Sequence, residues 1–313
     1  MAAEQRMTRE EEFLKKNDLF RRNAFLIIQE MVDLSRPPPE HPSVLVDEIL
    51  HSIFFLGKIN NPPFSPQSIV TDNDMLNKLK GRYPQPFVLY SSQLPKRSPI
   101  SCVLDMIVRL MGQKNEDEII KRMQELILQL KKDEATDLVS STICVSQKNK
   151  NSVRYYGVSM STSGPVPGRI IVAASCLSAW DSYVAGAVMT YFPKKSKKPY
   201  FDGTIKLPEQ VRCQAFSLTN GQPMPPCRSC GNLFGLTTSE TKEWAYGNCA
   251  EPESVSNLLK IEKEVREQAR PTSATYTDVN RKKAEESVWK ELMGFLNMLK
   301  FKWDKHFYTP QGV

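Results

Sequence analysis

Apolar residues in the first 134 positions recur every three or four residues, a spacing that places side chains on one face of a helix. Four segments carry the pattern: 8–33, 43–57, 101–111 and 115–132. In the last of them, Ile119, Met123 and Leu130 fall on one stripe with charged residues opposite. The third is apolar on most sides, as a buried helix would be. The pattern predicts an all-helical N-terminal domain over 1–134.

After residue 134 the pattern changes to runs that favour strands. Segments 138–145 and 153–160 are rich in β-branched and aromatic residues and flank a polar turn, so they predict a β-hairpin. A further strand is predicted at 213–219, and 170–175 fit either a strand or the start of a helix. Loops are expected at 163–168 and 271–280, and helices at 179–192, 252–268 and 284–302. Together these elements predict an α/β domain over 135–313.

Composition sets broad limits on the class of protein. The 313 residues suffice for one large domain or two ordinary ones, and 40% hydrophobic residues are enough to build a core. The 42 basic and 35 acidic side chains give a net charge of +7, which is compatible with an anionic partner. No apolar run approaches the roughly 20 residues that span a bilayer. The charged segment 1–22 also lacks the apolar stretch of a signal peptide. We therefore expect an intracellular protein, cytoplasmic or nuclear, with no membrane partner.

The seven cysteines are odd in number and scattered, unlike a secreted disulfide framework. Cys227 and Cys230 form a Cys-x-x-Cys motif after Pro226, and Cys249 follows with Glu251 two positions later. At a helix N-terminus the two sulfurs of such a motif face one point, and the backbone N–H groups favour thiolates. Three thiolates leave one position of a zinc ion open to water. The spacing therefore predicts a Zn²⁺ site with a carboxylate beside it.

Histidine is scarce, which limits the kinds of metal site and of catalytic mechanism that the chain can carry. Only His41, His51 and His306 occur, and none lies near a candidate nucleophile in sequence. This argues against a three-histidine metal site and against Ser-His or Cys-His nucleophilic catalysis.

At the cysteine motifs the chain resembles the zinc-dependent nucleoside and nucleobase deaminase superfamily, whose signatures are His- or Cys-x-Glu and Pro-Cys-x-x-Cys. The matching runs are Cys249-Ala250-Glu251 and Pro226-Cys227-Arg228-Ser229-Cys230. Their order along this chain is the reverse of the family's. The resemblance covers 137–268 and implies a cytidine-deaminase-like three-layer α/β/α domain with a mixed sheet. It also implies zinc on the three cysteines, Glu251 as the group that activates a zinc-bound water, and hydrolysis of a nucleobase amine in a nucleotide or nucleic acid.

The residues leave two other interpretations of the cysteines open. Cys213 precedes the motif and could close a structural site of four thiolates. Glu251 would then be an ordinary acidic residue in the first turn of a helix, and the protein would be non-catalytic and act through protein partners. A redox Cys-x-x-Cys is a third interpretation, although the βαβ context that supports it is missing.

Two segments suggest partners. A basic run between two pairs of aromatic residues can hold phosphates and stack bases, as in proteins that bind single strands, although such runs are also common in solvated loops. Trp244 and Tyr246, beside the zinc motif, fit either a base-stacking role or the core. The predicted N-terminal helices could bind a protein partner. The basic run consists of Lys194, Lys195, Lys197 and Lys198.

Overall fold

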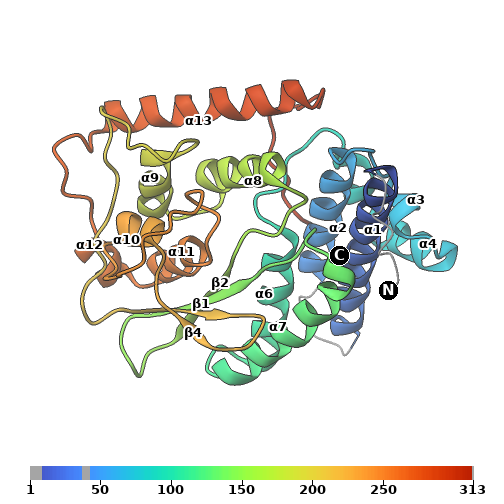
Figure 1. Ribbon diagram of the computed structural model, residues 1–313, viewed down its shortest axis with the longest axis horizontal. Helices are drawn as coiled ribbons and strands as arrows, with labels where there is room; N and C mark the ends of the chain where they lie inside the picture. Colours follow the sequence, from blue (N-terminus) through green and yellow to red (C-terminus); the bar gives the residue numbers. More distant parts are fainter. Residues whose placement is uncertain (1–8, 37–42, 312–313) are drawn as a thin grey trace, which may run out of the picture.

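The structure is a computed structural model that describes residues 9–36 and 43–311. It combines helices with one small sheet, as the sequence predicts (Figure 1). The N-terminal part contains α1 (Arg9–Leu34), α2 (Ser43–Lys58), α3 (Pro66–Ile69), α4 (Asn73–Arg82), α5 (Pro84–Leu89), α6 (Pro99–Met111), α7 (Glu116–Leu130) and a short 3₁₀ turn (Lys132–Glu134). The four helices predicted there are present as α1, α2, α6 and α7. Their apolar stripes form one core; in α7, for example, Ile119, Met123 and Leu130 are all buried.

The second part of the chain holds the sheet and the remaining helices. These are β1 (Thr142–Gln147), β2 (Arg154–Val158), α8 (Pro165–Ser178), α9 (Ser182–Tyr191), β3 (Arg212–Ser217), β4 (Pro223–Met224), α10 (Arg228–Phe234), α11 (Glu251–Ile261), α12 (Lys263–Gln268) and α13 (Asp278–Met298). The predicted hairpin is β1–β2, with Val145 opposite Tyr156.

The sheet has the strand order β2-β1-β3-β4, and every neighbouring pair is antiparallel. The expectation of a mixed sheet is therefore wrong. The connection through α8 and α9 brings the chain back to the C-terminal end of β1, where Gln147 pairs with Arg212, the first residue of β3. Strand β3 therefore runs antiparallel to β1. The broader prediction of an α/β protein is confirmed.

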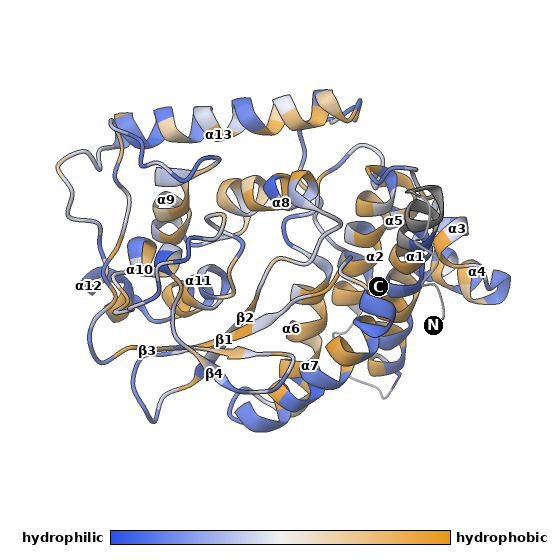
Figure 2. Ribbon diagram, viewed as in Figure 1, coloured by the Kyte–Doolittle hydropathy of each residue, from blue (hydrophilic) through white to orange (hydrophobic). Residues whose placement is uncertain are grey.

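Strand β1 is buried on both faces because helices cover the sheet from two sides (Figure 1). On one side α11 packs against β1 and β2, and the Ser146 and Ser254 hydroxyls lie 2.9 Å apart across that contact. Helix α6, from the N-terminal part, packs against β2. Figure 2 shows apolar residues concentrated in the helices α2, α6 and α8 and in the strands, with hydrophilic residues in the connecting loops. The start of α11 is thus held against the middle of the sheet.

The segment 163–178 differs from the prediction. The loop expected at 163–168 gives way to helix α8 from Pro165 onward, with Pro165 in its first turn. Of the two alternatives for 170–175, the helix is present and the strand is not. Its apolar residues are buried all round, between α9 and α13. A fully buried run lacks the alternation of exposed and buried positions, so its period cannot separate a strand from a helix.

Two helix boundaries also differ from the prediction. The helix expected over 252–268 is broken at Glu262, whose ψ of 83° is not helical, into α11 and α12. The helix expected from 284 begins at Asp278, because the Thr277 side chain accepts a hydrogen bond from the Asn280 N–H and caps the first turn. It ends at Met298, so Trp303 lies beyond it and stacks on Trp289.

The end of the chain packs against the N-terminal helices. Phe307 forms a bridge with Leu94, and the Tyr308 hydroxyl donates a hydrogen bond to Asp47 of α2. His51 stacks on the Tyr308 ring with 3.8 Å between the centroids. Residues expected in separate domains, 1–134 and 135–313, therefore share contacts at this end as well as at the sheet. Within the described residues, no helix is both long enough and apolar enough to cross a bilayer.

Candidate metal centre and pocket

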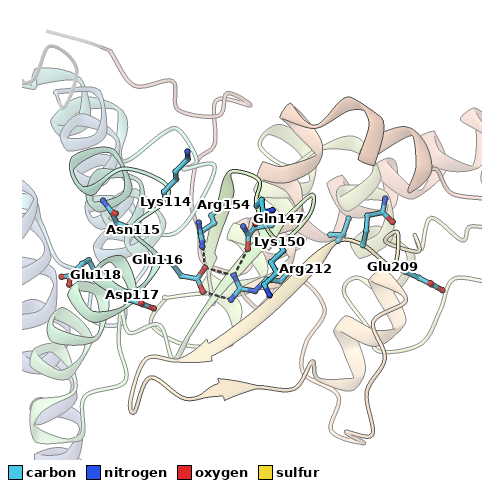
Figure 3. A pocket seen from close by; sticks show the side chains of 13 residues that line it. Lys114, Asn115, Glu116, Asp117, Glu118, Gln147, Lys150, Arg154, Glu209 and Arg212 are labelled. Carbon is cyan, nitrogen blue, oxygen red and sulfur yellow. Dashed lines mark hydrogen bonds and ion pairs between the residues drawn. The ribbon is translucent and has the colours of Figure 1, made fainter.

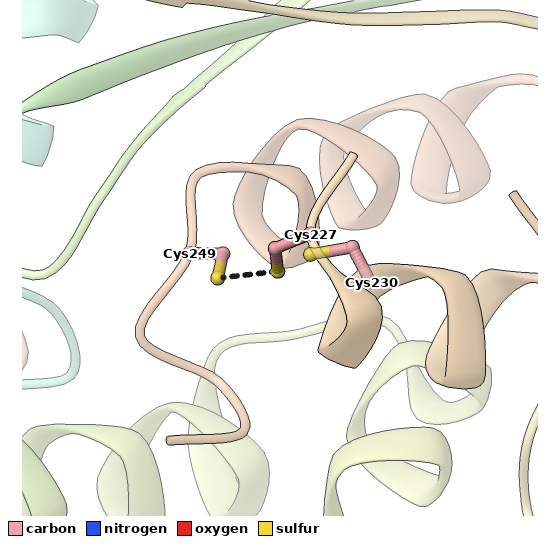
Figure 4. A group of neighbouring side chains, drawn as sticks. All are labelled: Cys227, Cys230 and Cys249. Atoms are coloured by element: carbon pink, nitrogen blue, oxygen red, sulfur yellow. Dashed lines mark hydrogen bonds between the residues drawn. The ribbon is translucent and has the colours of Figure 1, made fainter. Parts of the chain in front are cut away.

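Cys227, Cys230 and Cys249 lie together, although Cys249 comes from a different segment (Figure 4). Their sulfur atoms all lie within 4.8 Å of one another, and the Cys227 and Cys249 sulfurs are 3.5 Å apart. Sulfurs bound to one zinc ion at about 2.3 Å in a tetrahedral shell are about 3.8 Å apart. The spacing therefore fits a single metal ion, and the convergence predicted from the sequence is present despite the reversed order of the motifs.

The first two cysteines are positioned by the start of α10. Cys227 is the extended residue that precedes the helix, and Cys230 is buried in its first turn. The incoming chain is fixed by the Thr238 hydroxyl, which donates to the Pro226 carbonyl, and by the Arg228 N–H, which donates to the Lys242 carbonyl. Both sulfurs consequently face the helix N-terminus, as the motif predicts.

Cys249 is positioned by a tight turn before α11. Gly247 has a φ of +94°, a conformation that favours glycine. The Asn248 carbonyl accepts a hydrogen bond from the Met160 N–H, which ties this turn to the end of β2. Pro252 occupies the first turn of α11, where its missing N–H costs no helical hydrogen bond.

Gly157 lets α11 approach the sheet closely. A Cβ atom at this position would lie 2.4 Å from the Ser254 backbone nitrogen and 2.6 Å from the Ala250 carbonyl oxygen. No other residue fits here without moving the helix. A glycine inside a strand is a signal of close backbone approach, and the sequence offers it in Tyr156-Gly157-Val158.

Three sulfurs this close cannot all ionise without a cation. Hydrogen bonds from the Cys230 and Cys249 thiols and from backbone N–H groups lower the pKa of Cys227 to about 2. Burial raises the pKa of Cys230 well above its usual range, and the hydrogen bond to Cys227 does the same for Cys249. A divalent ion would remove this conflict, because all three sulfurs could then be thiolates.

Glu251 lies at the same place, as the sequence predicts. Its side chain is buried, with 4% of the residue exposed. Burial and the negative charge of Cys227 raise the pKa of this carboxyl, while hydrogen bonds to its own helix start and to Cys230 act to lower it. A carboxylate so placed can hold a proton beside the sulfur group.

Cys227, Cys249 and Glu251 line a pocket of about 310 Å³, and Cys230 lies buried behind them. Its walls combine apolar side chains with three hydroxyl groups, those of Ser141, Thr142 and Ser159, and the Asn248 amide. The wall residues are Ser141, Thr142, Ser159, Met160, Ala215, Met224, Pro225, Trp244, Ala245, Asn248 and Ala250. A concave, largely apolar pocket with a few polar groups at its end is typical of small-molecule sites. Apart from Trp244, these residues could not be identified from the sequence, because they come from five separated segments.

Cys213 does not join the group of three sulfurs. It lies in β3, and its sulfur is 3.7 Å from that of Cys144 on the neighbouring strand. Among the described residues, the cluster that could hold a metal ion contains only Cys227, Cys230 and Cys249. A closed site of four thiolates that includes Cys213 is therefore not formed among the described residues.

The basic run 194–198 contributes less positive surface than its sequence suggests. Lys198 donates hydrogen bonds to the Met189 and Phe192 carbonyls, and burial lowers its pKa to about 8. Lys197 pairs with Asp202. Lys194 and Lys195 remain exposed.

A larger hollow, of about 850 Å³, lies at the opposite end of the strands (Figure 3). Its floor is an ion-pair network in which Arg154 and Arg212 both donate to Glu116 at the start of α7, with distances of 2.6–2.7 Å. Arg212 also donates to Gln147. Because the charges on its floor are already paired, this hollow does not single out an anion or a cation as ligand.

A scan against models of known protein families and searches of curated proteins and of solved structures found no match for this chain.

Proposed function

We propose that this protein is a zinc-dependent hydrolase that removes the exocyclic amine of a nucleobase, like the deaminases its motifs resemble. The observation that carries the proposal is the meeting of three cysteine sulfurs and one buried carboxylate at the end of a pocket. Helix α11 beneath the sheet, and α10 beside it, would correspond to the two helices that carry the family's motifs. The likeness concerns these parts, since the sheet itself is antiparallel.

Cys227, Cys230 and Cys249 would hold the ion, which would supply a Lewis acid that lowers the pKa of water at its open position. Glu251 would take a proton from the attacking water and pass it to the leaving nitrogen. The ring carbon then exchanges its C–N bond for a C–O bond, and ammonia leaves. The apolar walls around Met160 would hold a planar ring in place.

The test is metal analysis of the purified chain combined with ammonia release from nucleosides, nucleotides and single-stranded oligonucleotides. Glu251→Gln should retain zinc and lose activity by roughly 10²–10⁴-fold, the usual contribution of a general acid–base. Glu286→Gln, on the exposed face of α13, is the matched control and should leave both unchanged. Bound zinc without turnover of any nucleobase would refute catalysis and favour the alternative of a structural zinc protein.

A further inference from the structure

The mouth of the pocket carries an exposed aromatic side chain held by a cation. Trp244 lines the pocket, yet 49% of the residue remains exposed. The Lys242 ammonium lies 3.8 Å from the centroid of the Trp244 ring. An indole face at the edge of a pocket provides a stacking surface that a planar base can use whatever its sequence.

The backbone of residues 242–244, which carries this stacking platform, is fixed to α10, the helix at whose start two of the cysteines lie. The Ser229 hydroxyl donates to the Trp244 carbonyl at 2.7 Å, and the Arg228 N–H donates to the Lys242 carbonyl at 3.1 Å. The backbone of the platform therefore keeps its position relative to the metal group. Such preorganisation reduces the entropy lost on binding.

Further positive charge reaches the same edge from the loop after α9. The Lys195 ammonium donates to the Glu243 carbonyl, next to Trp244. Below it, Tyr191 and Tyr246 stack with 3.9 Å between their centroids, which joins the two segments. Apart from Lys197, which pairs with Asp202, the exposed cations of these segments are Lys194, Lys195, Arg228 and Lys242, against the carboxylates of Glu240 and Glu243. The edge is thus net positive.

We propose that this edge binds single-stranded nucleic acid, with one base in the pocket and the neighbouring base stacked on the face of the Trp244 ring opposite Lys242. A free nucleotide would leave the outer part of the Trp244 ring uncovered, whereas a strand supplies both an adjacent base and successive phosphates. Lys195, Lys242 and Arg228 contact the phosphates. The assignment of a base to the pocket rests on the function proposed above.

The test measures binding of labelled single-stranded oligonucleotides to the zinc-loaded full chain carrying Glu251→Gln, so that turnover does not interfere. Trp244→Ala should weaken binding by about 5- to 150-fold, and Trp244→Phe should restore much of the loss. The double variant Lys195→Gln/Lys242→Gln should reduce the slope of log affinity against log salt by about 1.4, for two lost phosphate contacts. Lys282→Gln/Lys290→Gln, on exposed positions of α13, is the matched control and should leave affinity and slope unchanged.

The two proposals fail in different ways. The unaltered protein could bind the strand with this dependence on Trp244 and salt and yet release no ammonia. That result would support the proposed nucleic-acid-binding edge and refute catalysis. If instead the protein releases ammonia from free nucleosides and Trp244→Ala leaves the affinity for the strand unchanged, the proposed nucleic-acid-binding edge is refuted. The proposed hydrolase activity is then supported. A free nucleotide that displaces the strand at a concentration equal to the strand's own Kd would also overturn the surface.

Discussion

Gly157 makes the geometry of the metal group sensitive to a single methyl group. In Gly157→Ala, the new Cβ would lie 2.4 Å from the Ser254 nitrogen, 2.6 Å from the Ala250 oxygen and 2.8 Å from the Glu253 Cβ. Ordinary contact begins at 3.4 Å, so the closest pair must separate by 1.0 Å (3.4 minus 2.4). The two closest partners are backbone atoms of α11 and of Ala250 just before it, so no change of rotamer relieves the clash. The start of the helix must move away from the sheet.

The expected cost follows from overpacking of a well-packed contact. Such insertions destabilise proteins by about 1–3 kcal/mol, which lowers the melting temperature of a chain this large by roughly 2–10 °C. Glu251 begins α11 and Cys249 lies just before it, so both should shift relative to Cys227. Zinc affinity should therefore fall by roughly 10-fold or more, as when groups that orient metal ligands are lost.

Thermal unfolding of the metal-free protein and competition with a zinc chelator measure the two effects. Gly294→Ala is the control: it adds the same methyl group inside α13, where nothing lies within 4 Å. There, the better helix propensity of alanine should stabilise the protein by up to about 1 kcal/mol and leave zinc affinity unchanged. A Gly157→Ala protein with the stability and zinc affinity of the original chain would refute the close contact between α11 and the sheet.

Two further predictions concern single side chains. Cys249→Ser should abolish stoichiometric zinc binding, whereas Cys213→Ser should retain one zinc ion per chain in the same metal analysis. Loss of zinc from both variants would contradict this and support a site of four thiolates. Burial acts to raise the pKa of Glu116, but hydrogen bonds and charge from Arg212 and Arg154 hold it below its usual value of 4.5. Because the lowered pKa belongs to the folded state, this stabilisation is present above pH 4.5 and is lost as the pH falls through the folded value. Glu116→Gln should therefore lower the free energy of unfolding by about 1–3 kcal/mol at pH 7, measured by urea unfolding. The difference from the original chain should shrink below pH 4.5. A difference that stays constant or grows on acidification would contradict the ion-pair network.

The candidate ligands could be predicted from sequence because each motif carries its own local geometry. A Cys-x-x-Cys at a helix start aims both sulfurs at one point, and Pro252 marks the start of the next helix. What spacing cannot give is whether two helix starts meet in space. That meeting depends on the turn at Gly247 and on the close approach at Gly157, both of which involve residues far apart in the chain.

The antiparallel sheet and α8 were harder to predict, for a related reason. Strand direction follows from the path of the connection, and α8 supplies much of that path. Its apolar run is buried on every side, so the residues Ile170–Ala174 show no periodicity that would separate a helix from a strand. The resemblance of the motifs carried an expectation of a mixed sheet that the residues of the strands did not themselves support.

X-ray absorption at the zinc edge of the metal-loaded chain reports the shell of a zinc ion that three cysteines would hold, with its remaining position open to the pocket. We predict three sulfur atoms at about 2.3 Å and one lighter atom at about 2.0–2.1 Å. Four sulfur atoms around the ion, or a chain that takes up no zinc when its cysteines are reduced, would contradict it.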